Sequence, residues 1–235
     1  AVAVASGLGR RLVAPGRLQP VALAAAPAAA VPALRSASRY AATGSAREAL
    51  APGLAGGAKR LGDIAKVPLL LRESPTRVRE IWLEQFREKD RTIAGTLAEA
   101  EYRSLVANAT ACPMFLVPVP RGSGYLNLVW QAQRDLFLYQ TLEAYQRGTG
   151  AIELSVALFT ELLPTHKMAL LHGDLQSPLL TKDEAGRIVR YTREAYMDPA
   201  RFDWVKRFNL SPRDFNYEEF LTEFRPLERW HAAGA

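Results

Sequence analysis

The chain is 235 residues long, so it has room for one domain of ordinary size plus a leader segment, and its 49% apolar content excludes wholesale disorder. The formal net charge of +6 suggests a nucleic-acid ligand, but residues 1–60 hold eight of the 30 basic residues and only one of the 24 acidic ones. Residues 61–235 therefore carry 22 basic and 23 acidic residues, and this balance argues against nucleic acid as a partner, because binding to the phosphate backbone needs a basic surface.

Residues 1–46 are rich in alanine, carry scattered arginine and serine, and contain no acidic residue, which is the composition of an organelle transit peptide. A positive, acid-free segment is attracted to import receptors and, in mitochondria, is driven inward by the membrane potential. Mitochondrial and plastid transit peptides share this composition, and we prefer a mitochondrial location, with the plastid stroma as the less favoured alternative. Residues 47–60 contain several glycines and a proline and are expected to form a linker. The folded domain is then expected at 61–225, followed by a tail at 226–235.

The first helices are predicted from capping signals. Ser74 and Pro75 are typical of a helix start, and Val78, Trp82 and Phe86 follow on one helical face. Thr96 and Glu99 have the spacing of a capping box, which predicts a second helix that ends near Asn108.

Strand patterns fill the middle of the chain. Alternating apolar residues, prolines and a Gly-Ser-Gly turn predict about five strands. The first should lie at the margin of the sheet, because Pro118 lies within it and Pro113 and Pro120 flank it. The five expected strands are Met114–Val119, Tyr125–Gln133, Asp135–Leu142, Ala151–Phe159 and Lys167–His172.

Helical patterns return after the strands. Thr181 and Glu184 form a capping box ahead of a helix to Met197, and Asp198-Pro199 and Ser211-Pro212 each predict a further helix start. Strands that are segregated from the helices predict an α+β fold, with an antiparallel sheet flanked by N-terminal and C-terminal helices.

No catalytic residue emerges from the motifs. The run from His172 to Leu175 is similar to the catalytic loop of aminoglycoside and choline kinases, but the position of the expected magnesium-binding Asn is Leu179. We therefore expect this run to end a strand in a turn before a helix, and a small-molecule phosphotransferase stays as an alternative function. Cys112 has no recognisable histidine base, so a buried structural thiol is favoured.

No cofactor or metal site is expected either. The single cysteine excludes an intramolecular disulfide and a cysteine-based metal site, and the three histidines are scattered along the chain. No apolar run approaches the roughly 18 residues that a membrane-spanning helix needs, so we expect no membrane span.

Aromatic residues on the expected strands suggest a binding surface instead. If one face of the sheet is covered by helices, aromatic side chains that alternate onto the other face would form an exposed apolar surface. Alternation selects Tyr125, Trp130, Phe137 and Tyr139 as candidate partner-binding residues.

The run from Cys112 to Arg121, followed by Gly124 and Tyr125, resembles the most recognisable stretch of the mitochondrial F1-ATPase assembly factor family. Further matches in the same order are Ile81-Trp82, Gln131, the strand at 167–174 and the segment from Phe208 to Phe215, so the resemblance covers residues 61 to 224.

The resemblance implies a molecular chaperone without enzymatic activity or cofactors. It would bind the free beta subunit of the F1 ATP synthase, shield its subunit interface, and leave when the alpha subunit competes for the same surface. It implies a soluble protein of the mitochondrial matrix that is a monomer when free. A stable accessory subunit of ATP synthase is a further alternative.

Overall fold

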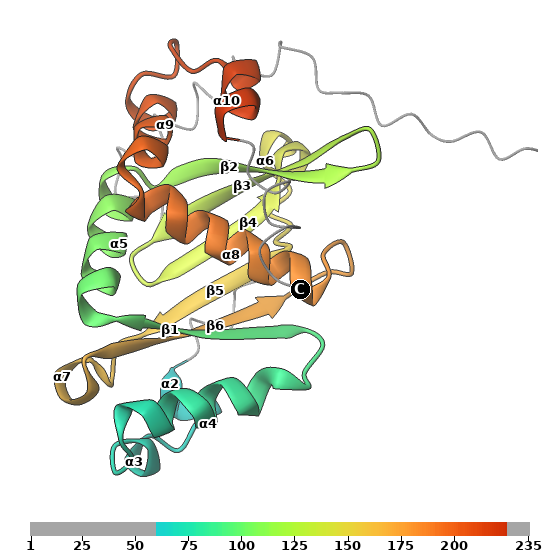
Figure 1. Cartoon of the computed structure of the whole chain (residues 1–235). Helices are drawn as coiled ribbons and strands as arrows, with labels where there is room; N and C mark the ends of the chain where they lie inside the picture. The colour runs from blue at the N-terminus through green and yellow to red at the C-terminus, as the bar shows by residue number, and fades with distance from the viewer. Residues whose placement is uncertain (1–59, 225–235) are drawn as a thin grey trace, which may run out of the picture.

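Six antiparallel strands form one sheet in the computed structural model of the chain, which describes residues 60–224 (Figure 1). The strands are β1 (Thr92–Ala98), β2 (Met114–Arg121), β3 (Gly124–Gln133), β4 (Leu136–Thr141), β5 (Leu154–Phe159) and β6 (Met168–Leu175). The helices are α2 (Leu61–Ile64), α3 (Val67–Leu70), α4 (Pro75–Arg87), α5 (Glu99–Ala111), α6 (Leu142–Arg147), α7 (Leu163–His166), α8 (Lys182–Met197), α9 (Pro199–Leu210) and α10 (Tyr217–Phe224).

The strand order is β1-β6-β5-β4-β3-β2, and every neighbouring pair is antiparallel. Helix α5 leads from β1 to the far side of the sheet, where β2 begins. Strands β2 to β6 then return as a meander, so that the last strand lies beside the first. Strands β1 and β2 are consequently the two edges of the sheet.

Helices cover the two faces of the sheet unequally. One face packs against α5 and α8, and α9 and α10 extend this layer past β2 (Figure 1). On the opposite face, α2, α3 and α4 cover β1, β5 and β6 in a smaller core around Trp82. The indole Nε1–H of Trp82 donates to the Leu171 carbonyl at 3.0 Å, which fixes α4 against β6.

The structure confirms the α+β class and each of the five expected strands. Pro118 and Pro120 lie in the edge strand β2, as expected for residues that cannot donate a ladder hydrogen bond. Ser74 caps α4, and the capping box of Thr181 and Glu184 opens α8. Asp198 caps α9.

Two predicted helix starts are wrong. Thr96 lies inside β1 opposite Leu170, and α5 begins at Glu99 without a side-chain cap, because β1 pairs with β6 along its whole length. Thr92–Ala98 is thus a sixth strand, in addition to the five expected from the sequence. Ser211 ends α9, and α10 begins only at Tyr217, where the Asn216 side chain accepts from the Glu218 and Glu219 amides.

The predicted transit peptide at 1–46, nearly all of the linker at 47–60 and the tail at 226–235 lie outside the described residues. These boundaries stay predictions.

Candidate functional site

Three of the four candidate aromatic residues are buried, so the expectation that they form an exposed surface is wrong for Trp130, Phe137 and Tyr139. Their side chains are 0%, 3% and 1% exposed, whereas Tyr125 is 38% exposed. Because they all point to the face that α8 covers, they belong to the core between the sheet and that helix. Of the four, Tyr125 alone stays a candidate for partner contact.

Hydrogen bonds from α8 explain how this core accommodates polar aromatic groups. The Trp130 Nε1–H donates to the hydroxyl of Tyr196 at 3.0 Å, and that hydroxyl donates to the Cys112 carbonyl at 2.7 Å. The Tyr139 hydroxyl donates to the Thr192 hydroxyl at 3.0 Å, and burial raises the pKa of Tyr139 above its usual range. These aromatic residues therefore stabilise the fold.

The run from His172 to Leu175 forms the end of β6 and precedes the loop to α8. This agrees with the expectation of a strand that ends in a turn before a helix. His172 is buried, and its ring lies 4.8 Å from that of Phe86 in an edge-on contact. Gly173 lies where a Cβ would come within 2.5 Å of Ile93. This packing accounts for the His-Gly-Asp run without a phosphotransferase loop.

Cys112 is a buried free thiol, as expected. Burial raises the pKa of the Cys112 thiol, which is the opposite of the shift that activates a nucleophile.

In residues 60–224 no cluster of three or more His, Cys, Asp or Glu side chains could hold a metal ion. Among the helices described there, none is both long and apolar enough for a membrane span. His166 is buried, and its two ring nitrogens pair with the Thr165 hydroxyl and the Glu73 carbonyl at 2.7 and 2.8 Å.

A groove of about 900 Å³ follows the outer edge of β1, between α4 and α8. In Figure 1, β1 is the edge strand that lies between these two helices. The apolar part of the groove includes Leu83, which is an exposed leucine, and Ile93. The charged side chains that line it are Arg87, Lys182, Arg187, Arg190, Asp183 and Glu194, four cations against two anions.

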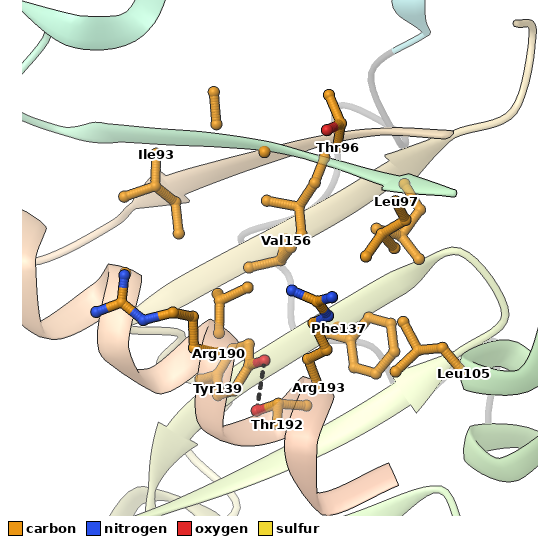
Figure 2. A pocket seen from close by; sticks show the side chains of 16 residues that line it. Ile93, Thr96, Leu97, Leu105, Phe137, Tyr139, Val156, Arg190, Thr192 and Arg193 are labelled. Atoms are coloured by element: carbon orange, nitrogen blue, oxygen red, sulfur yellow. Dashed lines mark hydrogen bonds between the residues drawn. The ribbon is translucent and has the colours of Figure 1, made fainter. Parts of the chain in front are cut away.

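A smaller cavity of about 180 Å³ adjoins the groove between α8 and the sheet. Figure 2 shows Arg190 and Arg193 of α8 beside this cavity, with the hydrogen-bonded pair of Tyr139 in β4 and Thr192 in α8 between them. The Arg193 guanidinium pairs with the Glu101 carboxylate of α5, so its charge is held at the rim. The cavity and the groove share Ile93, Ala94, Gly186 and Arg190 in their linings.

The elements around the groove explain how it stays open. Lys182, at the first turn of α8, donates to the carbonyls of Phe86 and Lys89 at 2.9 and 3.0 Å, and so fixes the end of α4 beside α8. Gly186 has no atom within 4 Å of where its Cβ would be, so α8 presents a gap to the edge of β1.

None of these groove residues was a candidate at the sequence level. The missed signal was the run Thr92–Ala98, which is rich in threonine and apolar residues, together with arginines at 187 and 190 on the polar side of an amphipathic helix. Sequence patterns showed neither that this run is a strand nor that the arginines face its edge.

The fold and the groove define an α+β protein with a positively charged candidate docking surface along one sheet edge. A family model described as ATP11 protein matches residues 18–221, and the chain belongs to this family.

Two relatives of the chain are mitochondrial F1 complex assembly factors. The chain is 27% identical over 169 residues to the human ATP synthase mitochondrial F1 complex assembly factor 1, an alignment that covers 70% of this chain and 51% of the human protein. It is 24% identical over 169 residues to the zebrafish protein of the same name, covering 70% of this chain and 56% of that protein. The chain thus spans about half the length of the curated relatives it matches.

Proposed function

We propose that the chain is an assembly factor for the F1 sector of mitochondrial ATP synthase. The observation that carries this proposal is the match of residues 18–221 to the ATP11 protein family, whose curated relatives are named mitochondrial F1 complex assembly factors. The acid-free, arginine-bearing segment 1–46 is in keeping with mitochondrial import.

More specifically, we propose that the chain is a chaperone in the mitochondrial matrix that binds the free F1 beta subunit and has no enzymatic activity. Subunits that will later form a hexamer expose large apolar interfaces before assembly, and such interfaces aggregate. A chaperone for such a client needs an accessible binding surface that can be vacated. The groove along β1 and the exposed Tyr125 are the surfaces proposed for this contact.

A capture experiment with purified subunits tests the client. Tagged chain is incubated separately with isolated beta subunit, isolated alpha subunit and assembled F1, and the retained protein is quantified. We expect retention of free beta alone, and release of beta when alpha is added, because alpha competes for the same interface. Retention of assembled F1 in fixed stoichiometry would instead favour a permanent accessory subunit.

A matched pair of charge reversals then tests the surface. Arg187 lines the groove, whereas Arg213 is exposed between α9 and α10, at the other end of the sheet (Figure 1). Arg187→Glu should weaken beta capture several-fold and Arg213→Glu should leave it unchanged. Equal effects of the two substitutions would show that the groove is not the binding surface.

A further inference from the structure

The two edges of the sheet differ in whether their outward backbone groups are already bonded. In an antiparallel ladder, alternate residues bond to the neighbouring strand, and the residues between them direct their N–H and C=O groups away from it. One identified bonded pair is therefore enough to show which residues of an edge strand face outward.

Most of the outward backbone groups of β2 are bonded to side chains or, at its prolines, lack an N–H. The Ala132 amide donates to the Pro113 carbonyl at 2.7 Å, so residues with even numbers face outward in β2. The Asn209 side chain bonds both the amide and the carbonyl of Met114, at 3.2 and 2.6 Å. The Leu116 carbonyl accepts from the Tyr191 hydroxyl at 3.0 Å, and Pro118 and Pro120 have no N–H. This edge is closed to a further strand.

The edge of β1 is open. The Glu99 amide donates to the Lys167 carbonyl at 2.8 Å and the Leu175 amide to the Arg91 carbonyl at 2.9 Å, so residues with odd numbers bond to β6. Ala94 and Thr96 therefore direct their N–H and C=O groups outward. Within residues 60–224, no loop or side chain is hydrogen-bonded to these four groups.

The surroundings of these groups select an acidic partner. The groove beside Ala94 is lined by four cations and two anions. The anion Glu194 is paired with Arg201 at 2.6 Å, and the cation Arg87 is paired with Glu84 at 2.6 Å. The Arg187 side chain has no hydrogen bond or ion pair to another residue in the described range 60–224. An incoming carboxylate would thus meet the Arg187 guanidinium on the α8 side of the strand.

There is also room for a main chain beside the strand. Gly186 leaves α8 without a side chain opposite the edge, since nothing lies within 4 Å of its Cβ position. The groove volume of about 900 Å³ accommodates an extended segment of several residues.

We propose that β1 is a docking strand, which binds an extended, acidic segment of a partner protein as a seventh strand of the sheet. The Ala94 and Thr96 backbone groups supply the ladder, and the cations of α8 select carboxylate side chains. The inference deepens the proposed function, because it names the kind of segment the groove receives, and it rests on the groove being a protein-binding surface.

Peptide pools test strand addition without any ATP synthase subunit. Two pools of nonapeptides share randomised apolar and threonine positions and differ only in carrying three glutamates or three lysines. Each is added at millimolar concentration to ¹⁵N-labelled chain, and amide hydrogen exchange is followed by NMR. We expect the glutamate pool to slow exchange at Ala94 and Thr96 about tenfold, which corresponds to about 1.4 kcal/mol. Gly95, whose amide already bonds to β6, is the internal control and should not change.

Two modifications separate strand addition from unspecific attraction. A glutamate pool with a methyl group on every backbone nitrogen keeps its side-chain charge but has no N–H to donate to the ladder from either edge, and it should give no protection. Arg187→Glu should reverse the preference toward the lysine pool, while Arg213→Glu should not. Absence of protection by the glutamate pool, or equal protection by the methylated pool, would overturn the inference.

The peptide experiment and the beta-subunit capture experiment can fail independently of each other. Protection by the glutamate pool without capture of beta would support the docking strand and refute the proposed client. Capture of beta without any protection by the peptides would refute the docking strand and leave the client in place.

Discussion

Ile93 of β1 lies over Gly173 of β6, so closely that a Cβ on Gly173 would come within 2.5 Å of Cγ1 of Ile93. The same Cβ would lie 3.3 Å from Cγ2 of Val156 in β5. Glycine at this position thus lets three neighbouring strands pack under α8, and it positions the strand that forms the groove.

Substitution of this glycine should destabilise the protein. Gly173→Ala forces Ile93 out of its position, and overpacking of this kind costs about 1–3 kcal/mol in the free energy of unfolding. Gly186→Ala is the matched control, because its methyl group meets no atom and alanine favours the helix by about 1 kcal/mol. Urea denaturation of the two variants should move the midpoint in opposite directions. Equal midpoints would contradict the close packing at Gly173.

The aromatic residues of the sheet should divide into core and surface. Trp130→Ala should cost about 3–5 kcal/mol, because it leaves a cavity in the core and removes one of the two hydrogen-bond partners of the Tyr196 hydroxyl. Tyr125→Ala should change stability by less than about 0.5 kcal/mol, since its side chain is exposed. Thermal unfolding measures both. A similar small effect for the two would show that Trp130 is not a core residue.

Lys182 should hold the two walls of the groove together. Lys182→Met removes a cation that donates to three carbonyls at the end of α4, those of Phe86, Arg87 and Lys89. A cation at a helix C-terminus contributes about 0.3–2 kcal/mol. We expect a loss within this range and faster proteolysis of the segment after α4. Lys206→Met, which breaks the exposed pair with Asp203, should cost less than about 1 kcal/mol and is the control.

Glu184 should make stability depend on pH. Partial burial acts to raise the pKa of Glu184, but hydrogen bonds from Arg121 and Thr181 outweigh it and lower the pKa below its usual 4.5. A carboxyl group whose pKa is lowered by folding stabilises the native state above its unfolded pKa, and the contribution is lost as pH falls through the folded pKa. Glu184→Gln should therefore be less stable at neutral pH and lose less stability on acidification below about pH 4.5.

The measurement for Glu184 is urea denaturation of both proteins at a series of pH values from neutral to acidic. Curves of stability against pH that converge at acidic pH are expected. Parallel curves would mean that Glu184 has the same pKa in the folded and unfolded chain.

Local signals in the sequence predicted most of the fold. Ser74, Thr181 and Asp198 cap helices because their hydroxyl or carboxylate oxygens accept backbone amides a few residues ahead, a relationship that spacing alone reveals. The prolines of β2 likewise predicted an edge. Thr96 was misread because its spacing to Glu99 fits a capping box equally well, and pairing with β6, more than 70 residues away, decides the outcome.

The same local signals could not predict the candidate site. Alternation placed Phe137 and Tyr139 on the same face of one strand, but it could not show that α8 covers that face or that Trp130 of the next strand shares it. The open edge at Ala94 depends on the strand order of the sheet, which places β1 at one end with only β6 as its neighbour. Local sequence patterns do not give strand order. Three of the four cations that line the groove come from α8, about 90 residues later in the chain.

The central claim is that the chain supports assembly of F1, and the most direct measurement is the amount of assembled F1 in mitochondria that lack it. We predict that assembled F1 falls and that beta subunit accumulates in the insoluble fraction. Expression of the chain or its Arg213→Glu variant should restore assembly, and the Arg187→Glu variant should restore it less. An unchanged amount of assembled F1, with beta remaining soluble in the absence of the chain, would contradict the account.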